Sequence, residues 1–504
     1  MPLHGFAFEA VPHAPHLADL PLLEALHRAL PEQAIDEVVA ATGAQERRRR
    51  RLPARLVVAL VVALGLWARD GLRDVLANLV EGLRERDPAA WAGWRLPAKS
   101  ALTQARQRLG PRPLRVLFHR LAGPVAAPTT PGACLFGLRL MAIDGTYEDV
   151  ADTPANATYF GRRCTGPTQS PFPQLHCVYL AEVGTHAIVD AMIAPCATSE
   201  QCLAKGLLRS IEPGMLVMTD RGFVGVCFLQ ELVERSASFL GRIPQHVFQH
   251  KQHVLKDGSY LVTFLPKDFA GLKKPLTLRI IEYTIEEKVA VRLEQVTPSR
   301  VASGSGSTNP DIRKVHRIAT TLLDPDLYPA RDLCVLYHER WEIELAIDEI
   351  KDHQRLSSQP LRSKLPILVL QELYALLLAH YAVCALRLQA AQTKGLDPDR
   401  VSFTEGIRVL KSGLNLSPFL IPAGTDRVLM RLHADLVHHH HLLPPRRLRF
   451  NCRVVKQTCT RFRRKKPEHQ QVKLPSSTTF ADLVVTGPPV SETSGTSPEL
   501  LEIV

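Results

Sequence analysis

Two aspartates and a glutamate stand in contexts that could bring three carboxylates to one site. Asp144 and Asp220 each end a short apolar run, in LMAIDGTY and LVMTDRGF, and Glu344 lies in YHERWEIELAIDEIK. An Asp followed closely by Gly after a strand is often only a turn. In an open α/β sheet, however, the carboxyl ends of the strands form the edge where ligands bind. Carboxylates without His or Cys partners favour Mg²⁺ over zinc.

The segment around Glu344 predicts a helix with further polar groups along one edge. Residues 337–351 contain no Gly or Pro, and their apolar residues recur at helical spacing. At about 100° per residue, four polar residues gather within a sector of roughly 60°: Tyr337, Arg340, Glu344 and Lys351. Such an edge could bind a metal ion and phosphates. Arg340 and Glu344 could also be an ordinary surface pair at i, i+4.

The composition favours a folded, basic protein with a polyanionic partner. The chain has 504 residues, 45% of them hydrophobic, which is enough for a large core and for more than one domain. Its 62 Lys+Arg against 50 Asp+Glu give a formal net charge of +12, and nucleic acid is the leading candidate partner. The ten cysteines include no CxxC pair, which favours reduced thiols over zinc ligands or disulfides.

The apolar runs 56–67 and 367–388 are the two candidates for membrane spans. The first is too short to span a bilayer, and the second contains four polar or charged residues. The first residues do not resemble a signal peptide. We therefore expect a soluble, cytoplasmic protein in which both runs are buried helices and no membrane is a partner.

The patterns divide the chain into four parts. Residues 1–130 read as a helical, DNA-binding domain. Strand-like runs with an intervening helix then indicate an α/β core over 131–390, with a β-rich insertion at about 244–312. Residues 391–466 read as a helical and basic region, and 467–504, rich in Ser, Thr and Pro, are predicted to be a disordered tail.

Several positions outside the core are candidates for contact with DNA. The short predicted helix ALTQARQRL follows Lys99 and contains Arg106 and Arg108, so it could enter a groove or simply pack against its neighbours. Basic patches near Arg47 and Arg453 could contact phosphates. The tract 438–441 of four histidines is expected to be solvated rather than a metal site.

The motifs together resemble the DDE transposases of bacterial insertion sequence family four. The resemblance rests on AIDGT, TDRGF and the helix signature Y-x2-R-x3-E-x6-K, and it extends over roughly residues 20–466. The order of parts agrees as well, with SALTQARQRLG in the N-terminal region and a β insertion before the Glu helix. The resemblance implies a ribonuclease-H-like catalytic core. It implies a DNA transposase as the function.

The resemblance also implies roles for individual residues. Asp144, Asp220 and Glu344 would hold two Mg²⁺ ions about 3.5–4 Å apart, and Mn²⁺ could substitute. Three residues would contact phosphates near the cleaved end and help to hold a flipped base: Tyr337, Arg340 and Lys351. Arg221, just after the second Asp, could touch the same backbone. The enzyme would bind the terminal inverted repeats of its own element, cut the ends and join the 3′-OH to target DNA. It would act as a homodimer in a synaptic complex at the bacterial nucleoid.

The β insertion departs from the family in one respect. Relatives with a known base-flipping mechanism carry a Trp there, whereas this chain has none between Asp220 and Tyr337. Four other aromatic residues could stack on a base or pack in the core: Phe248, Tyr260, Phe264 and Phe269. In this family the first 3′-OH can attack the opposite strand and form a hairpin, and without the Trp that step is less well supported by the sequence than the metal site.

Two further functions remain open at this point. A transposase-derived DNA-binding regulator that no longer cuts is expected to have lost a carboxylate, and none is lost. A related nuclease without strand transfer would lack matching inverted repeats beside its gene.

Overall fold

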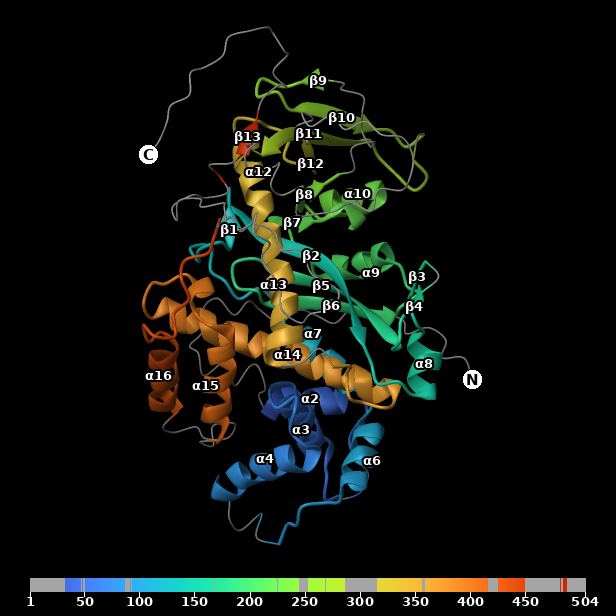
Figure 1. The fold of residues 1–504 in the computed structure, drawn as a ribbon, viewed down its shortest axis with the longest axis vertical. Helices are drawn as coiled ribbons and strands as arrows, with labels where there is room; N and C mark the ends of the chain where they lie inside the picture. Colours follow the sequence, from blue (N-terminus) through green and yellow to red (C-terminus); the bar gives the residue numbers. More distant parts are fainter. Residues whose placement is uncertain are drawn as a thin grey trace, which may run out of the picture.

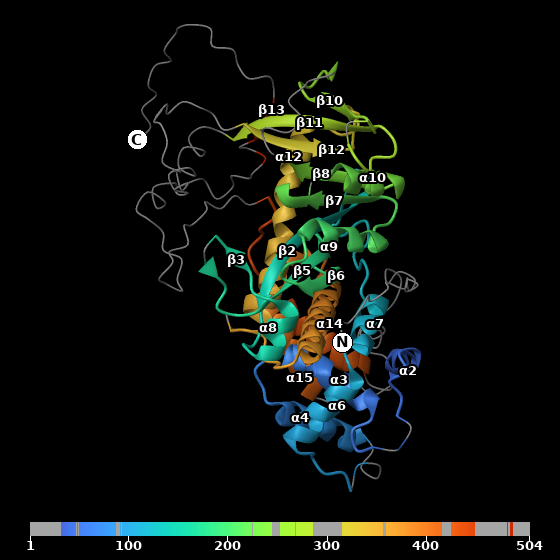
Figure 2. The same ribbon diagram turned by 90° about the vertical axis from the view of Figure 1, so that its right-hand side faces the viewer.

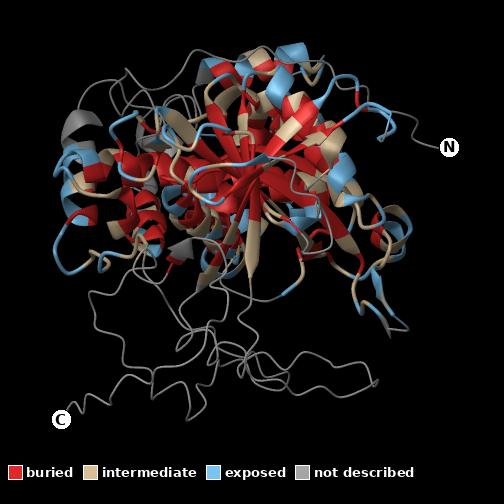
Figure 3. Ribbon diagram, turned by 90° about the horizontal axis from the view of Figure 1, so that it is seen from above, coloured by how far each residue is buried: buried red, intermediate tan, exposed pale blue. Residues whose placement is uncertain are grey.

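The structure is a computed structural model that describes residues 32–448 and 481 and 484–486. Within the first range it leaves out 47, 49, 87–90, 92, 167, 224, 244–252, 268, 286–314, 356–358 and 416–424. Several predicted features lie outside the described residues. They are Arg47, Phe248, the part of the predicted insertion after residue 285, and the basic residues 449–466 with Arg453. Figure 3 shows the buried residues gathered along the centre of the molecule.

A mixed β-sheet forms the centre of the predicted α/β core. Its first strands, in spatial order, are β6 (Ile188–Pro195), β5 (Gln174–Glu182), β2 (Leu138–Asp149), β7 (Met215–Thr219) and β8 (Ser238–Arg242). β6, β5 and β2 are antiparallel neighbours, whereas β7 is parallel to β2 and β8 is parallel to β7. This order and these directions are those of a ribonuclease-H-like core, so the predicted fold class is confirmed.

Helices cover both faces of this sheet, which explains the nearly continuous apolar runs of its strands. Met141 and Ile143 of β2 pack on the face of α9 (Glu200–Leu207) and α10 (Val226–Glu234). Leu140 and Ala142 pack on the other face, with α12 (Ala330–His338) and α13 (Glu342–Asp348). Figures 1 and 2 show α12 and α13 as one column across the strands. The face of each strand residue therefore follows from its place in the alternation.

The sheet continues beyond β8 through β12 (His316–Thr320), which follows the predicted β insertion, and then through the strands of the insertion. These are β11 (Leu276–Ile285), β10 (Tyr260–Phe264) and β9 (His253–Val254), and each strand is antiparallel to its neighbour. A short strand, β13 (Val484–Thr486), pairs with β11. The prediction of disorder from 467 onward is therefore wrong for 484–486. Three β-branched residues pair with β11 there, which the composition of the tail does not reveal.

The N-terminal helices gather on one long helix from the other end of the sequence. They are α2 (Glu32–Ala41), α3 (Ala54–Leu66), α4 (Leu72–Arg86), α6 (Lys99–Leu109) and α7 (Arg112–Leu121). Helix α3 packs on α14 (Pro366–Gln392) so closely that a Cβ at Gly65 would lie 2.1 Å from the Ala375 carbonyl oxygen. One hydrophobic core runs through both. The predicted boundary at residue 130 is thus not a break in the core.

Helix α14 is the one described helix that is long and apolar enough to cross a membrane. Of its most apolar window, 78% is buried inside the protein, and Figure 1 shows it between the sheet and the N-terminal helices. It is therefore the buried helix that the sequence predicted. Helices α15 (Phe403–Asn415) and α16 (Thr425–Leu436) pack beside it.

The remaining elements are short. They are β1 (Cys134–Leu135), α8 (Pro154–Phe160), β3 (Cys164–Thr165), β4 (Thr168–Gln169), and the 3₁₀ turns η2 (Leu208–Ser210), η3 (Arg221–Phe223), η4 (Glu339–Trp341) and η6 (Pro398–Arg400). The segment η5 (Glu349–Gln354) is a π-helix.

Candidate active site

The two aspartates lie at the same level on neighbouring parallel strands. Ile143 of β2 pairs with Thr219 of β7, and Asp144 and Asp220 are the next residue in each chain. By the alternation along a strand, Asp144 belongs to the face on which Ala142 packs, which is the face of α12 and α13. The register of one parallel pair thus brings together two residues that are 76 positions apart in sequence.

Asp144 does not end its strand, contrary to the sequence prediction. β2 continues to Asp149 and stays paired with β5, whereas β7 stops at Thr219. A backbone N–H near each carboxylate orients it: Gly145 N donates to Asp144 Oδ1 (2.7 Å) and Gly222 N donates to Asp220 Oδ1 (2.8 Å). Asp144 therefore faces the opening that forms where its parallel neighbour ends, and it does not belong to a turn.

The predicted helix is present, although it is not a uniform α-helix. Residues 330–354 are helical throughout, passing from α12 through η4 and α13 into η5. Two side chains of this helix bind to β7 and β2. Tyr337 Oη donates to the Thr219 carbonyl oxygen (3.1 Å), and Lys351 Nζ donates to Thr146 Oγ1 (2.8 Å) and to the Tyr147 carbonyl oxygen (2.9 Å). The helix thereby lies across both aspartate strands.

Arg340 joins the helix to the first aspartate. Its Nη1 lies 3.4 Å from Asp144 Oδ2 and its Nη2 lies 2.7 Å from Glu344 Oε1. The Arg340 side chain is only 11% exposed. The pair of Arg340 and Glu344 is therefore not an ordinary surface pair, because the same guanidinium also contacts Asp144. A cation already stands between two of the three predicted metal ligands.

The chemistry of these groups fits a hard divalent ion. Burial raises the pKa of Asp144 to about 6, against the opposing attraction of Arg340, and Glu344 and Asp220 add repulsion. A partly desolvated carboxylate beside other carboxylates is stabilised by a cation. Three carboxylates supply only oxygen ligands, which suit Mg²⁺ or Mn²⁺.

The predicted DNA contacts fare unequally. Arg221 is exposed in η3 directly after Asp220, and Lys99 and Arg108 are exposed on α6. Arg106, by contrast, is buried, and it donates to Gln371 Oε1 (3.1 Å) and to the Leu368 carbonyl oxygen (3.2 Å). The prediction that Arg106 contacts DNA is therefore wrong.

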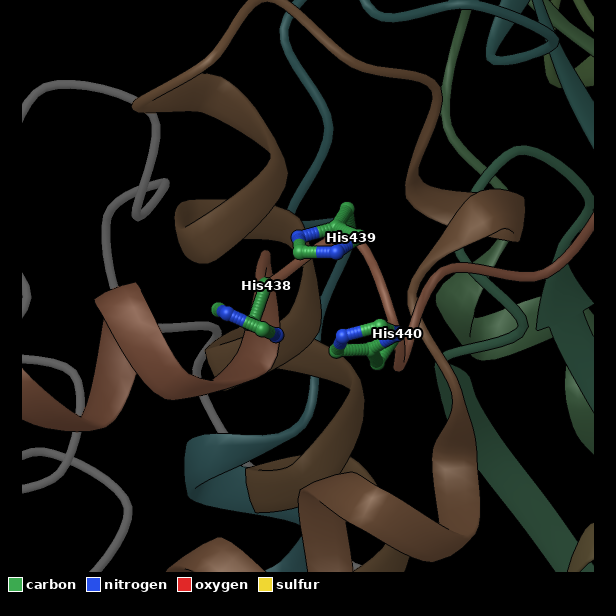
Figure 4. Close-up of side chains that lie close together, drawn as sticks. All are labelled: His438, His439 and His440. Atoms are coloured by element: carbon green, nitrogen blue, oxygen red, sulfur yellow. The ribbon is translucent and has the colours of Figure 1, made fainter.

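Of the aromatic residues considered for base stacking, one of the three described is exposed. Tyr260 and Phe264 are buried, whereas Phe269 is 37% exposed and packs edge-on against Phe264. His438, His439 and His440, from the histidine tract, are likewise exposed, with their rings gathered as Figure 4 shows. Their exposure agrees with the prediction of a solvated tract.

A buried network of charges contacts the face of the helix that points away from the site. The sequence analysis did not predict this network. Its members come from distant segments: His186, Glu342, Glu349, His380, Arg387, Asp399, Arg446 and Arg447. Glu349 accepts from His186 Nδ1 (3.1 Å), His380 Nε2 (3.2 Å) and Arg387 Nη1 (3.0 Å). Although burial alone would lower the pKa of His186, Glu349 and Glu342 raise it to about 9.

The raised pKa of His186 predicts that the protein is less stable at alkaline pH. A raised pKa contributes stability that is complete below the ordinary value of 6.5 and is lost as the pH rises through about 9. The contribution is about 3 kcal/mol, since one pH unit corresponds to about 1.4 kcal/mol. Urea denaturation at pH 6.5, 8 and 9.5 measures it.

The control for this pH dependence is His186→Asn. Position 186 has φ of +63°, which Asn tolerates, and Asn does not titrate. The facing groups Glu342, Glu349, Asp399 and Arg446 remain in this variant. If wild type and variant lose stability equally between pH 6.5 and 9.5, His186 is not the responsible group.

Comparison with known proteins decides the family. Residues 21–119 match the model "Insertion element 4 transposase N-terminal", and residues 136–381 match the model "Transposase DDE domain". The transposase InsG of insertion sequence element IS4 from Escherichia coli (strain K12) is 30% identical over 437 residues, which are 85% of this chain and 90% of that protein. The chain is an IS4-family DDE transposase. The family that the helix signature predicted is thus confirmed.

Two other proteins are similar to this transposase. A putative transposase, InsZ, of the same E. coli strain is 30% identical over 210 residues, or 42% of this chain and 67% of that protein. The cryo-EM structure of a piggyBac transposase synaptic complex with hairpin DNA aligns with a TM-score of 0.42 and 11% identity, over 83% of this chain and 86% of that chain. The DDE domain match encloses the two strands and the helix described above. The protein is a DNA transposase, and DDE domains use divalent metal ions.

Proposed function

We propose that this transposase cuts the ends of its own insertion sequence with Asp144, Asp220 and Glu344 as metal ligands, and then joins the 3′-OH to target DNA. The observation that carries the proposal is the convergence of two aspartates on β2 and β7 with a glutamate on the helix that crosses them. Divalent ions, when bound, would activate the attacking oxygen and stabilise the leaving one. We propose Mg²⁺ as the ion, with Mn²⁺ as a substitute.

Arg340 has a defined part in this proposal. Its guanidinium contacts both carboxylates, Asp144 at 3.4 Å and Glu344 at 2.7 Å. Ion binding would release this cation from one or both carboxylates, and a freed guanidinium binds phosphate in a bidentate manner. Arg340 would thus couple metal binding to the grip on the DNA backbone.

The remaining basic and hydroxyl groups would position the DNA end. Lys351 lies beside β2, and Arg221 is exposed next to Asp220, so both are suited to phosphates near the cut. Tyr337 holds the helix to β7, which makes its first role that of fixing the site. Lys99 and Arg108 on α6 are exposed for contact farther along the terminal repeat. Cutting of paired ends would require a homodimer on DNA.

The experiment that tests the function is cleavage of a labelled duplex carrying the element's own terminal repeat. Wild-type protein should bind this duplex with either Mg²⁺ or EDTA and should cut it at the repeat boundary only with Mg²⁺. Addition of a target plasmid should then yield strand-transfer products. A duplex with a scrambled terminal repeat is the control for specific binding.

Each of the other outcomes would indicate a different function for this protein. Binding that is specific for the repeat but never leads to cutting would indicate a regulator that has lost its catalysis. Cutting without joined products would indicate a nuclease without strand transfer. Equal cutting in EDTA would reject the metal site. Lys351→Ala belongs in the same assay, because weaker end binding with unchanged metal binding is the result expected if Lys351 contacts phosphate.

A further inference from the structure

Glu200 brings a fourth carboxylate to the opening between the two aspartate strands. It is the first residue of α9, the helix that connects β6 to β7 on the face of the sheet opposite to α12 and α13. Ser199 caps this helix, since its Oγ accepts from Cys202 N (3.3 Å). The start of the helix, and with it Glu200, is therefore fixed in place. No residue type or spacing in the sequence analysis singled it out.

Two glycines beside the aspartates make room for the Glu200 side chain. A Cβ on Gly145 would lie 2.0 Å from Glu200 Oε1, so any other residue after Asp144 would displace this carboxylate. Successive residues of a strand face opposite sides of the sheet, so position 145 belongs to the face of α9 whereas Asp144 belongs to the other face. The missing side chain thus lets Glu200 approach β2 at the level of Asp144.

The second glycine shows how near Glu200 is to the other aspartate. A Cβ on Gly222 would lie 2.9 Å from Glu200 Oε2 and 3.2 Å from Asp220 Oδ1, so the two carboxylates flank a single point. Gln201 Nε2, on the same helix, donates to the Gly222 carbonyl oxygen (3.3 Å). Two carboxylates that flank one point can both contact a cation bound there.

A buried histidine provides an independent sign of a missing group. His176 is 1% exposed, and its Nδ1 lies 2.8 Å from the Thr198 carbonyl oxygen, so Nδ1 carries the proton. Its Nε2 has no hydrogen-bond partner among the described residues and lies 3.9 Å from Glu200 Oε1. A buried polar atom without a partner beside a carboxylate leaves a space that suits the hydration water of a cation.

We propose that Glu200 is a fourth carboxylate ligand of the divalent-ion site formed with Asp144 and Asp220. The proposal rests on the function proposed above, and it adds a residue from the opposite face of the sheet. His176 serves as a positioning residue, because its buried Nε2 lines the same space. An alternative is that Glu200 only stabilises the N-terminus of α9, which would alter stability but leave metal affinity unchanged.

The test is Mn²⁺ binding by the full-length protein without DNA, followed by electron paramagnetic resonance of the free ion. Glu200→Gln should raise the apparent Kd for Mn²⁺ at least tenfold, since even outer-shell partners of a metal change its affinity by about 10–100-fold. The Mg²⁺ concentration that gives half-maximal cleavage should rise in parallel. Glu234→Gln is the matched control, because Glu234 is an exposed glutamate at the far end of α10. The Mn²⁺ affinity of this variant should equal that of wild type.

Asp220→Asn separates the outcomes of this test. If it loses Mn²⁺ binding while Glu200→Gln binds as wild type does, Glu200 is not a ligand and only the further inference is overturned. If both variants bind Mn²⁺ normally, the proposed metal site itself fails. Circular dichroism must show that Glu200→Gln melts within a few degrees of wild type. Should it not, Glu200→Asp, which keeps the charge, is expected to bind Mn²⁺ more tightly than a Glu200→Ala protein, and equal affinities would overturn the inference.

Discussion

Asp220→Asn should abolish cleavage at the terminal repeat while the protein still binds that repeat. The change removes a negative ligand at the end of β7 and leaves the volume and the hydrogen bond from Gly222 N nearly unchanged. Loss of a catalytic metal ion removes several kcal/mol of transition-state stabilisation, so the rate should fall about 10³-fold or more. Single-turnover cleavage of a labelled end duplex in Mg²⁺ measures this rate, and a gel-shift assay in EDTA measures binding.

Asp144→Asn and Glu344→Gln should behave in the same way, because each removes one carboxylate of the same set. DNA affinity should stay equal or increase slightly, since a negative charge near the phosphates is lost. Asp326→Asn is the control: Asp326 is 68% exposed and pairs with Lys256, outside the site. Near-normal cutting by any of the three variants would remove that residue from the site.

Glu349→Gln should strongly destabilise the fold. Glu349 is 5% exposed, and although burial alone would raise its pKa, Arg387 and His186 hold that pKa well below its usual range. Without this carboxylate, Arg387 and a protonated His186 lose their closest shared anion in the interior. Breaking a buried ion pair by removing one partner costs about 3–5 kcal/mol. Urea denaturation at pH 7, followed by circular dichroism, measures the change in the free energy of unfolding.

Glu344→Gln is the matched control on the same helix. Each substitution removes one glutamate charge, and the two positions are five residues apart. The Glu344 side chain is 33% exposed, whereas Glu349 is buried. We expect Glu344→Gln to destabilise the fold less than Glu349→Gln does, because Glu344 is partly exposed and Arg340 keeps Asp144 as a partner. If the two variants unfold at the same urea concentration, the buried network does not support the catalytic helix.

The elements that carry the proposed site residues were predictable because their signals are local. The apolar runs before Asp144 and Asp220 required only the short continuous hydrophobic stretch of a buried strand. The placement of Tyr337, Arg340 and Glu344 on one edge required only the helical period, and the observed helix keeps them near β2 and β7. Local periodicity does not depend on distant partners, so one sequence is enough to detect it.

Predictions about charged side chains failed where a distant partner decides. Arg106 has the spacing of a DNA contact, yet it pairs with Gln371, which is 265 positions away. Glu349 and Glu342 belong to the same short motif as Glu344, and only the fold buries them against His186. Burial of a charge depends on partners from other segments, and no periodicity within one helix encodes those partners.

The sequence by itself determined which residues could do the chemistry and on which elements they lie: two aspartates after apolar runs, a glutamate on a helix, and the family to which this pattern belongs. The tertiary structure alone decided that Asp144 and Asp220 share a level in parallel register, that Arg340 stands between two carboxylates, and that Glu200 approaches through the space at Gly145. The physical reason is that residue type and period are properties of a single segment. Register, burial and close approach are properties of pairs of segments, which form only when the chain packs.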